Sequence, residues 1–288
     1  MKIFGKKMSI GDFINYFLLL LVSFVCVLPF IYIVSVSLTD PDVYKPFTLY
    51  FFPEKISFDV YKYILQTNFF TNGLKNTIIV TVIGTVLNLL FTFTAAYALS
   101  AGKNYPGKKA FLAFVLFTLV FNAGIIPNYI LVRNLNLMNS LWSIILPGLT
   151  NAWSLIVVKS FMESIPRELE ESAKIDGCTE IRIFARIVLP LSAPSLASFT
   201  LFFAVAHWNA YFIPQMYLSD NDLWTVQLIV RTLVMDAGSD NLGVVDELMP
   251  QETLKMASVV LAMLPILVVY PFLQRYFVKG MMIGAVKG

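Results

Sequence analysis

Charged side chains are scarce in this sequence. Only 14% of its 288 residues are Asp, Glu, Lys or Arg, whereas a soluble globular domain carries roughly 25%. Hydrophobic residues make up 58%, so the chain would not remain soluble in water and must fold in lipid. The formal net charge of +3 offers no case for nucleic-acid binding. We therefore expect an all-α polytopic membrane protein in the cell membrane, surrounded by membrane lipid.

Residue types that catalyse reactions or bind metals are also rare. The chain has one histidine, His207, and two cysteines, Cys26 and Cys178. Two cysteines imply no disulfide framework, and we expect Cys26 to be buried as a small apolar residue. No second histidine, cysteine or carboxylate stands at ligand spacing from His207. A nucleophile elbow and a phosphate-binding Gly-Lys-Ser/Thr loop are both missing. We therefore expect no enzyme activity, no metal site and no cofactor in this chain.

Six apolar segments are long enough to cross a bilayer as helices. They cover approximately residues 13–38, 76–99, 110–131, 141–158, 192–218 and 256–274. Prolines and glycines within them should kink the helices rather than end them, because neighbouring helices can satisfy the freed backbone groups. The first segment follows a basic tail, as in a signal peptide, but it is too long and no small-residue cleavage site follows. The sequence thus predicts one membrane domain of six spans over residues 1–288.

Lysine and arginine are distributed unevenly between the connecting segments. Fourteen of the 21 basic residues fall in one alternating set of segments and seven in the other. The first set comprises the N-terminal tail, residues 100–109, residues 159–190 and the C-terminal tail, and the second comprises residues 39–75, 132–140 and 219–255. Because basic residues favour the cytoplasmic side, we predict that both termini and a loop at 163–190 are cytoplasmic. The loop 219–255, which holds seven acidic residues, is predicted to be extracellular.

No Asp, Glu, Lys or Arg lies well inside any of the predicted spans. Secondary transporters usually carry such groups within the membrane, so we expect the energy for transport to come from a partner. Neutral polar groups do enter the spans, including Asn122, Trp208, Asn209 and Tyr211. These four side chains line a translocation path in one interpretation. In the other they serve helix packing and an interfacial aromatic belt.

The cytoplasmic loop 163–190 is predicted to form two short helices around a turn. Ser164 is expected to cap the first helix and Pro166 to occupy its first turn. Gly177 is expected to end that helix in a left-handed conformation, and Thr179 to cap the second helix. An apolar stripe of the second helix would comprise Ile181, Phe184, Ala185 and Val188. A rigid helical loop of mixed charge suits docking to a partner, and the alternative is a solvated connection.

The same loop resembles the EAA signature of ABC-importer permeases. The matching residues are Glu171-Ser172-Ala173, Asp176-Gly177 and Ile187-Val188-Leu189-Pro190, with nine residues between Gly177 and Ile187. Ser172 departs from the usual alanine, but it is also small. The resemblance implies the type I ABC importer permease fold and a loop seated in a cleft of an ATP-binding subunit. Glu171 would pair there with a basic residue, and Gly177 would make the turn. The implied docking residues are Glu170, Glu171, Ala173, Asp176, Gly177, Ile187, Leu189 and Pro190.

Other stretches resemble carbohydrate permeases of the maltose-transporter type. They are residues 127–131, 135–140, 276–280 and 284–288. The resemblance implies import of oligosaccharides together with a second homologous permease, two ATP-binding subunits that hold ATP and Mg, and an extracellular solute-binding lipoprotein. Aromatic faces and neutral donors bind sugars, and the chain has 25 Phe and 13 Tyr. A peptide or amino-acid importer and a secondary transporter remain the alternatives.

Overall fold

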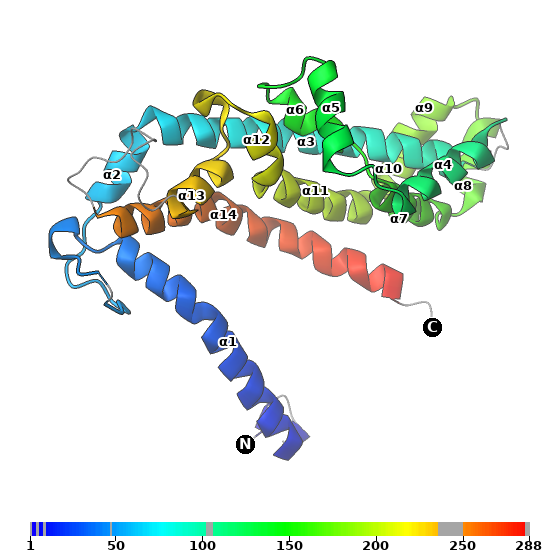
Figure 1. Ribbon diagram of the computed structural model, residues 1–288. Helices are drawn as coiled ribbons and strands as arrows, with labels where there is room; N and C mark the ends of the chain where they lie inside the picture. Colours follow the sequence, from blue (N-terminus) through cyan, green and yellow to red (C-terminus); the bar gives the residue numbers. More distant parts are fainter. Residues whose placement is uncertain are drawn as a thin grey trace. The chain divides into compact units, whose positions relative to one another are not determined.

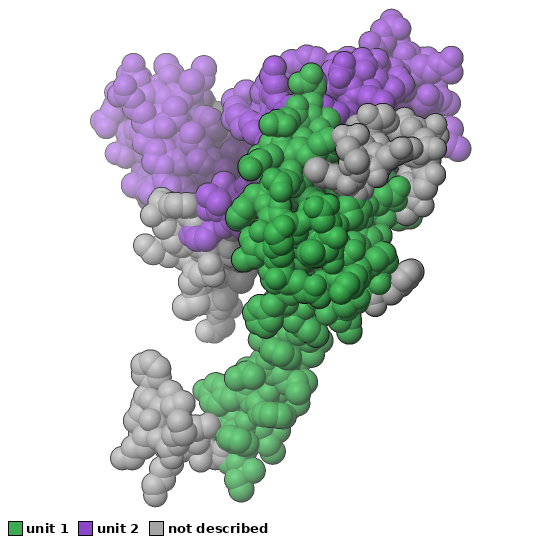
Figure 2. Space-filling model, turned by 90° about the vertical axis from the view of Figure 1, so that its left-hand side faces the viewer, with its two compact units in different colours: residues 1–68, 232–263 green, residues 69–231, 264–288 purple. Residues whose placement is uncertain are grey.

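The computed structural model is predominantly helical in the part of the chain that it describes. It describes residues 2–3, 6–7, 10–46, 48–101, 106–235 and 250–285, with side chains from residue 10 to 269 and at 271. The chain divides into two compact units, each made from two stretches of sequence (Figure 2). Residues 1–68 and 232–263 form the first unit, and residues 69–231 and 264–288 form the second.

The first unit is dominated by one long helix. It contains β1 (Lys2–Ile3) paired antiparallel with β2 (Lys6–Lys7), α1 (Ile10–Ser37), η1 (Pro41–Val43), α2 (Asp59–Gln66) and the first part of α14 (Gln251–Ala285). α1 is apolar on all sides, and its most apolar 18-residue window has no residue buried within the chain. A helix of this kind is stable only in an apolar solvent. Cys26 lies exposed on it, so the expected burial within the chain is wrong, because this helix has no protein core around it.

The segment after α1 folds back over the end of that helix. Its backbone is held where the Asp40 amide donates to the Lys55 carbonyl at 2.9 Å and the Ser57 amide donates to the Leu38 carbonyl at 2.9 Å. The Lys55 ammonium lies 2.6 Å from the Asp40 carboxylate. The hydrogen bond from Lys55, together with one from the Asp42 amide, holds the pKa of Asp40 below its usual value.

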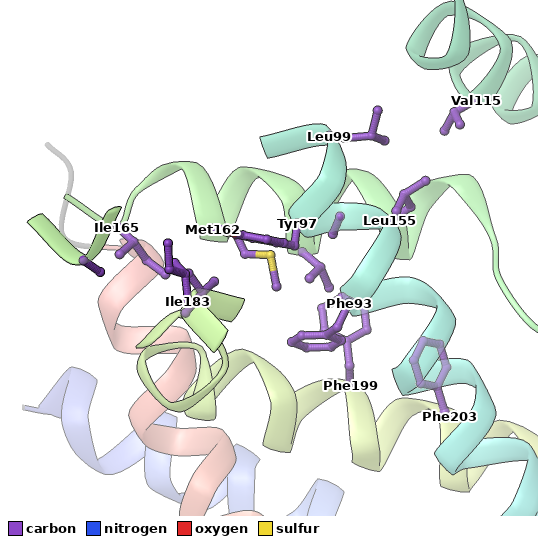
Figure 3. Close-up of a cluster of buried hydrophobic side chains, with 14 residues drawn as sticks. Phe93, Tyr97, Leu99, Val115, Leu155, Met162, Ile165, Ile183, Phe199 and Phe203 are labelled. Atoms are coloured by element: carbon purple, nitrogen blue, oxygen red, sulfur yellow. The ribbon is translucent and has the colours of Figure 1, made fainter. Parts of the chain in front are cut away.

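The second unit carries most of the remaining helices (Figure 1). They are α3 (Asn68–Ser100), α4 (Lys108–Val120), α5 (Ile125–Asn134), α6 (Trp142–Ile145), η2 (Leu146–Gly148), α7 (Ala152–Glu163), α8 (Arg167–Ile175), α9 (Glu180–Ile183), the π-helical turn η3 (Phe184–Val188), α10 (Leu189–Leu191), α11 (Ala193–Trp208), α12 (Phe212–Tyr217), η4 (Asn221–Leu223), the start of α13 (Val226–Met235) and the end of α14. Side chains of α3, α7 and α11 meet in the core of this unit (Figure 3). The rings of Phe93 and Phe199 pack edge to face there, with their centroids 6.4 Å apart.

The spans are less regular than the hydropathy pattern predicts. Among the residues that the structure describes, α1, α3 and α14 can each cross a membrane by length and composition, and two bent pairs bring the number to five if each pair is one span. The pair α6–α7 with η2 bends by 51°, and the pair α9–α11 bends by 81°. The predicted count of six spans and the cytoplasmic placement of both termini stay predictions, as does the single domain.

Three predicted segments are interrupted, and one of them is 141–158, which breaks at residues 149–151 between η2 and α7. Segment 110–131 breaks between Val120 and Ile125, because the Asn122 side chain accepts a hydrogen bond from the Gly124 amide at 2.8 Å and so competes with the helix. Segment 192–218 breaks at residues 209–211, between α11 and α12. Within the predicted extracellular loop 219–255, residues 236–249 and their four acidic side chains lie outside the described residues.

Candidate docking and translocation sites

A Schellman turn joins the two short helices of the loop 163–190. The Gly177 amide donates to the Lys174 carbonyl at 3.0 Å, and the Cys178 amide donates to the Ala173 carbonyl at 2.9 Å. Gly177 itself has φ of +80°, a left-handed conformation that suits glycine because it has no Cβ. The predicted turn at Gly177 is confirmed, and its hydrogen bonds hold α8 and the following chain in a defined angle.

The helix starts differ from the prediction. Ser164 does not cap α8; it follows α7, and its hydroxyl donates back to the Phe161 carbonyl at 2.6 Å. Pro166 instead occupies the N-cap of α8, which begins at Arg167. Proline there lacks an amide hydrogen and has extended ψ, so the chain turns before the helix starts. Thr179 stands at the N-cap of α9, but its side chain makes no capping bond.

One face of the loop is packed into the core of the second unit. Ala173, Ile183 and Val188 are buried there, and Cys178 and Phe184 are partly buried against the same cluster. In Figure 3 the side chains of Ile183, Met162 and Tyr97 lie together at one end of this core. Ile187 and Leu189 of the docking set also pack partly against it. These residues therefore join the loop to α3 and α7.

The apolar stripe of the second helix is only half as predicted. Ile181 is 81% exposed and Ala185 is exposed, whereas Ile183, which the predicted stripe leaves out, is fully buried. The π-helical turn η3 follows α9 directly and adds a residue to the turn. The residues that face the core are Ile183, Phe184, Ile187 and Val188, which also have helical spacing, so the prediction chose the wrong one of two possible faces.

A polar contact reinforces the packing between the loop and α3. The Tyr97 hydroxyl donates to a Glu180 carboxylate oxygen at 3.1 Å, and the other oxygen lies 3.2 Å from the Lys174 ammonium. The Tyr97 ring also lies 5.1 Å from the Phe184 ring. Glu180 thereby links α3, α8 and α9. Sequence reasoning missed Tyr97 and Glu180, and only the polar position of Tyr97 near the end of an apolar span could have signalled it.

The opposite face of the loop is open. Ile175 is 87% exposed and Ile181 is 81% exposed, on either side of the turn. Glu171, Asp176 and Gly177 are exposed as well. Pro190 is also exposed, whereas Glu170 is half-buried; Glu170 and Glu171 line a cleft of about 330 Å³ with Arg167 and Lys174. Two exposed isoleucine side chains surrounded by charged groups form a surface that is suited to binding another protein.

The fifth predicted segment contains a partly buried polar contact. The ring nitrogen Nε2 of His207 lies 2.7 Å from Asn88 Oδ1, and Asn88 Nδ2 donates to the Gly148 carbonyl at 2.6 Å. These contacts tie α11 to α3 and η2. Gly84 permits the close approach, since a Cβ there would lie 2.5 Å from the His207 ring.

The four candidate path residues do not form one cluster in the described contacts. Trp208 is buried and lines an apolar cavity of about 340 Å³ between α3, α11 and α14. Asn209 and Tyr211 are exposed in the break after α11. Asn122 lies in the break between α4 and α5, where it bonds its own turn. The structure adds a residue that sequence reasoning missed: the guanidinium carbon of Arg231 lies 4.4 Å from the centre of the Tyr211 ring.

Known proteins are similar to this chain in both sequence and fold. Residues 110–283 match the family described as binding-protein-dependent transport system inner membrane component. The chain is 42% identical over 286 residues to Protein LplC of Bacillus subtilis (strain 168). The aligned region covers 98% of this chain and 97% of that protein. It is 40% identical over 289 residues to the polygalacturonan/rhamnogalacturonan transport system permease protein YtcP of the same organism, with 98% and 100% covered.

A solved structure extends this similarity to three dimensions. The match is to a bacterial ABC transporter involved in the import of the acidic polysaccharide alginate, with a TM-score of 0.87 and 30% identity, and it covers 94% of this chain and 99% of that chain. The chain therefore belongs to the binding-protein-dependent transport system inner membrane component family, and it is a multi-pass membrane permease subunit of an ABC importer.

Proposed function

We propose that this permease forms, with a second homologous permease, the translocation path for oligosaccharides delivered by an extracellular solute-binding lipoprotein. The permease YtcP, 40% identical, is named for polygalacturonan and rhamnogalacturonan transport, and the similar solved structure is an importer of alginate. Arabinooligosaccharide permease AraQ of Halalkalibacterium halodurans is 29% identical over 93% of this chain. These names support a sugar polymer fragment over a peptide or amino acid.

The observation that carries the proposal is the two-faced loop 163–190. Its inner face is buried against α3 and α7, and Ile175, Ile181 and Glu171 are exposed on its outer face. A body attached in this way transmits movement, because a force on the outer face reaches the membrane helices through packed side chains. We assign the outer face to one of two ATP-binding subunits. Those subunits hold ATP and Mg and hydrolyse the nucleotide, and this chain does no bond chemistry.

The docking assignment is tested with substitutions on the open side of the turn. Glu171→Ala removes the charge that would pair with a basic residue of the ATPase. Gly177→Pro is incompatible with a φ of +80°. Both variants should insert in the membrane but lose ATP-driven uptake and co-purification of the ATPase subunit. Ser172→Ala, at the exposed residue between Glu171 and Ala173, is the matched control and should transport normally.

Retention of full uptake by both variants would refute the docking assignment. Uptake that persists in vesicles lacking the ATPase subunit would refute the importer mechanism and favour a secondary transporter. The solute is tested separately, by binding labelled oligosaccharides and peptides to the partner solute-binding protein. Binding of peptides alone would overturn the assignment to oligosaccharides.

A further inference from the structure

Tyr211 and Arg231 form an exposed pair next to the end of α11. The guanidinium carbon of Arg231 lies over the Tyr211 ring, 4.4 Å from the ring centroid, and both side chains are exposed. Within the described residues, no carboxylate lies within 4.0 Å of the guanidinium. The positive charge at this position is therefore not neutralised by a described part of the chain.

The surroundings of the exposed Arg231 side chain indicate that it faces an aqueous space. Val226, Leu228 and Ile229 of α13 are buried, so the helix packs with its apolar face and presents Arg231 on another face. An arginine facing hydrocarbon costs several kcal/mol, and a charged group in a membrane protein accordingly faces water or a ligand. The charge distribution also predicts that this segment lies on the extracellular side, from which the solute arrives.

The pair stands on a rigid support. Asn76 of α3 donates from Nδ2 to the carbonyls of Asp222 and Trp224, at 2.8 and 3.1 Å. The Thr77 hydroxyl oxygen accepts from the Val226 amide at 2.8 Å. Gly73 lets α13 approach so closely that a Cβ there would lie 2.3 Å from Ile229 Cδ1. α3 thus fixes the start of α13, and Arg231 needs little ordering when a ligand binds.

We propose that Tyr211 and Arg231 form a binding subsite for a carboxylate-bearing sugar, that is, a uronate unit of an acidic oligosaccharide. An arginine held on an aromatic ring keeps its N–H groups free to bind a carboxylate through two parallel hydrogen bonds. The exposed part of the tyrosine ring offers an apolar surface for the C–H groups of the sugar. The subsite rests on the proposed function, because it presupposes that the solute is an oligosaccharide. The named substrates of two similar proteins, polygalacturonan and alginate, are polymers of this chemical class.

The test compares two sugars that differ only at C6, which carries a carboxylate in one and an uncharged hydroxymethyl group in the other. Trigalacturonate and its carboxyl-reduced analogue are bound at equilibrium to the purified complex of permeases and ATPases, without the binding protein, so that the selectivity of that protein does not enter. Wild type should bind the acidic sugar more tightly. Arg231→Gln should weaken binding of trigalacturonate about 10-fold or more, as expected for a lost charge-assisted pair, and leave the reduced analogue unchanged. Arg231→Lys should retain part of the preference, and Tyr211→Leu should weaken both sugars.

Arg133→Gln is the matched control, because it removes an equal charge from an exposed position at the end of α5. It should leave both affinities unchanged. Equal affinity of wild type for the two sugars, or no detectable binding of either, would overturn the subsite. So would equal weakening of both sugars by Arg231→Gln, which would indicate a structural role for Arg231.

A lipid phosphate offers the same anionic chemistry as a uronate, and vesicle composition distinguishes them. Uptake is measured in phosphatidylcholine vesicles with and without anionic lipid. A defect of Arg231→Gln that occurs only with anionic lipid would overturn the sugar subsite, and a defect independent of lipid and specific for the acidic sugar would support it. Complete lack of sugar uptake by the wild-type system would contradict the proposed function instead, independently of this pair.

Discussion

Removal of one hydroxyl group, by Tyr97→Phe, should weaken the coupling between the loop 163–190 and the membrane helices. The substitution deletes the donor that lies 3.1 Å from Glu180 and retains the ring that lies 5.1 Å from Phe184. A hydrogen bond to a charged group contributes ~1.5–3 kcal/mol. Because the Glu180 side chain is 45% exposed, water competes for it, and we expect about 1–2 kcal/mol here.

A loss of this size changes the balance between an anchored and a released loop considerably. Every 1.4 kcal/mol corresponds to about a tenfold change in an equilibrium constant. The Lys174–Glu180 pair adds only about 0.2–1 kcal/mol, since both side chains are partly exposed. Tyr97→Phe should therefore lower the amount of sugar imported per ATP hydrolysed, while the ATPase subunit still binds through the outer face.

The assay is a double-mutant cycle in the reconstituted transporter. Tyr97→Phe, Glu180→Gln and the double variant are compared for uptake per ATP and for thermal unfolding in detergent. The two single effects should overlap in the double variant, with a coupling of about 1 kcal/mol. Tyr61→Phe is the control, because it removes a hydroxyl that donates to Ser37 at 2.7 Å in the other unit. Strict additivity, or an unchanged import-to-hydrolysis ratio in both single variants, would refute the anchoring role.

Two further predictions concern stability. Gly84→Ala should lower the unfolding temperature clearly, because the added Cβ would lie 2.5 Å from the His207 ring and disturb its contact with Asn88. Gly148→Ala is the control, since a Cβ there meets no atom within 4 Å, and it should lower the unfolding temperature much less. Equal losses for the two variants in a thermal scan would contradict this prediction. Asp40 has a lowered pKa because of Lys55 and the Asp42 amide, so its contribution to stability is present above its unfolded pKa and disappears as the pH falls through the lower folded pKa. Wild type should thus lose stability between about pH 5 and 3 more steeply than Asp40→Asn, and parallel pH profiles for the two would show that the pair with Lys55 is unimportant.

Much of this protein can be predicted from the sequence because lipid imposes simple requirements. A chain with few charges must form apolar helices, and α1, α3 and α14 follow the hydropathy pattern for this reason. The turn at Gly177 was also predictable, since a Schellman turn depends on local backbone conformation and glycine. The resemblance of the loop to the EAA signature correctly indicated the importer family, which the matches over nearly the whole chain confirm.

The tertiary structure decided what local patterns do not encode. Ile183 rather than Ile181 is buried, because Ile183 packs into the core around Tyr97, which other segments of the chain form. The meeting of Tyr97 with Glu180 joins residues 83 positions apart, and that of Tyr211 with Arg231 joins a helix break to a later helix. Composition and local periodicity reflect whether each segment favours lipid or water. These contacts, in contrast, form only when segments distant in the sequence pack together.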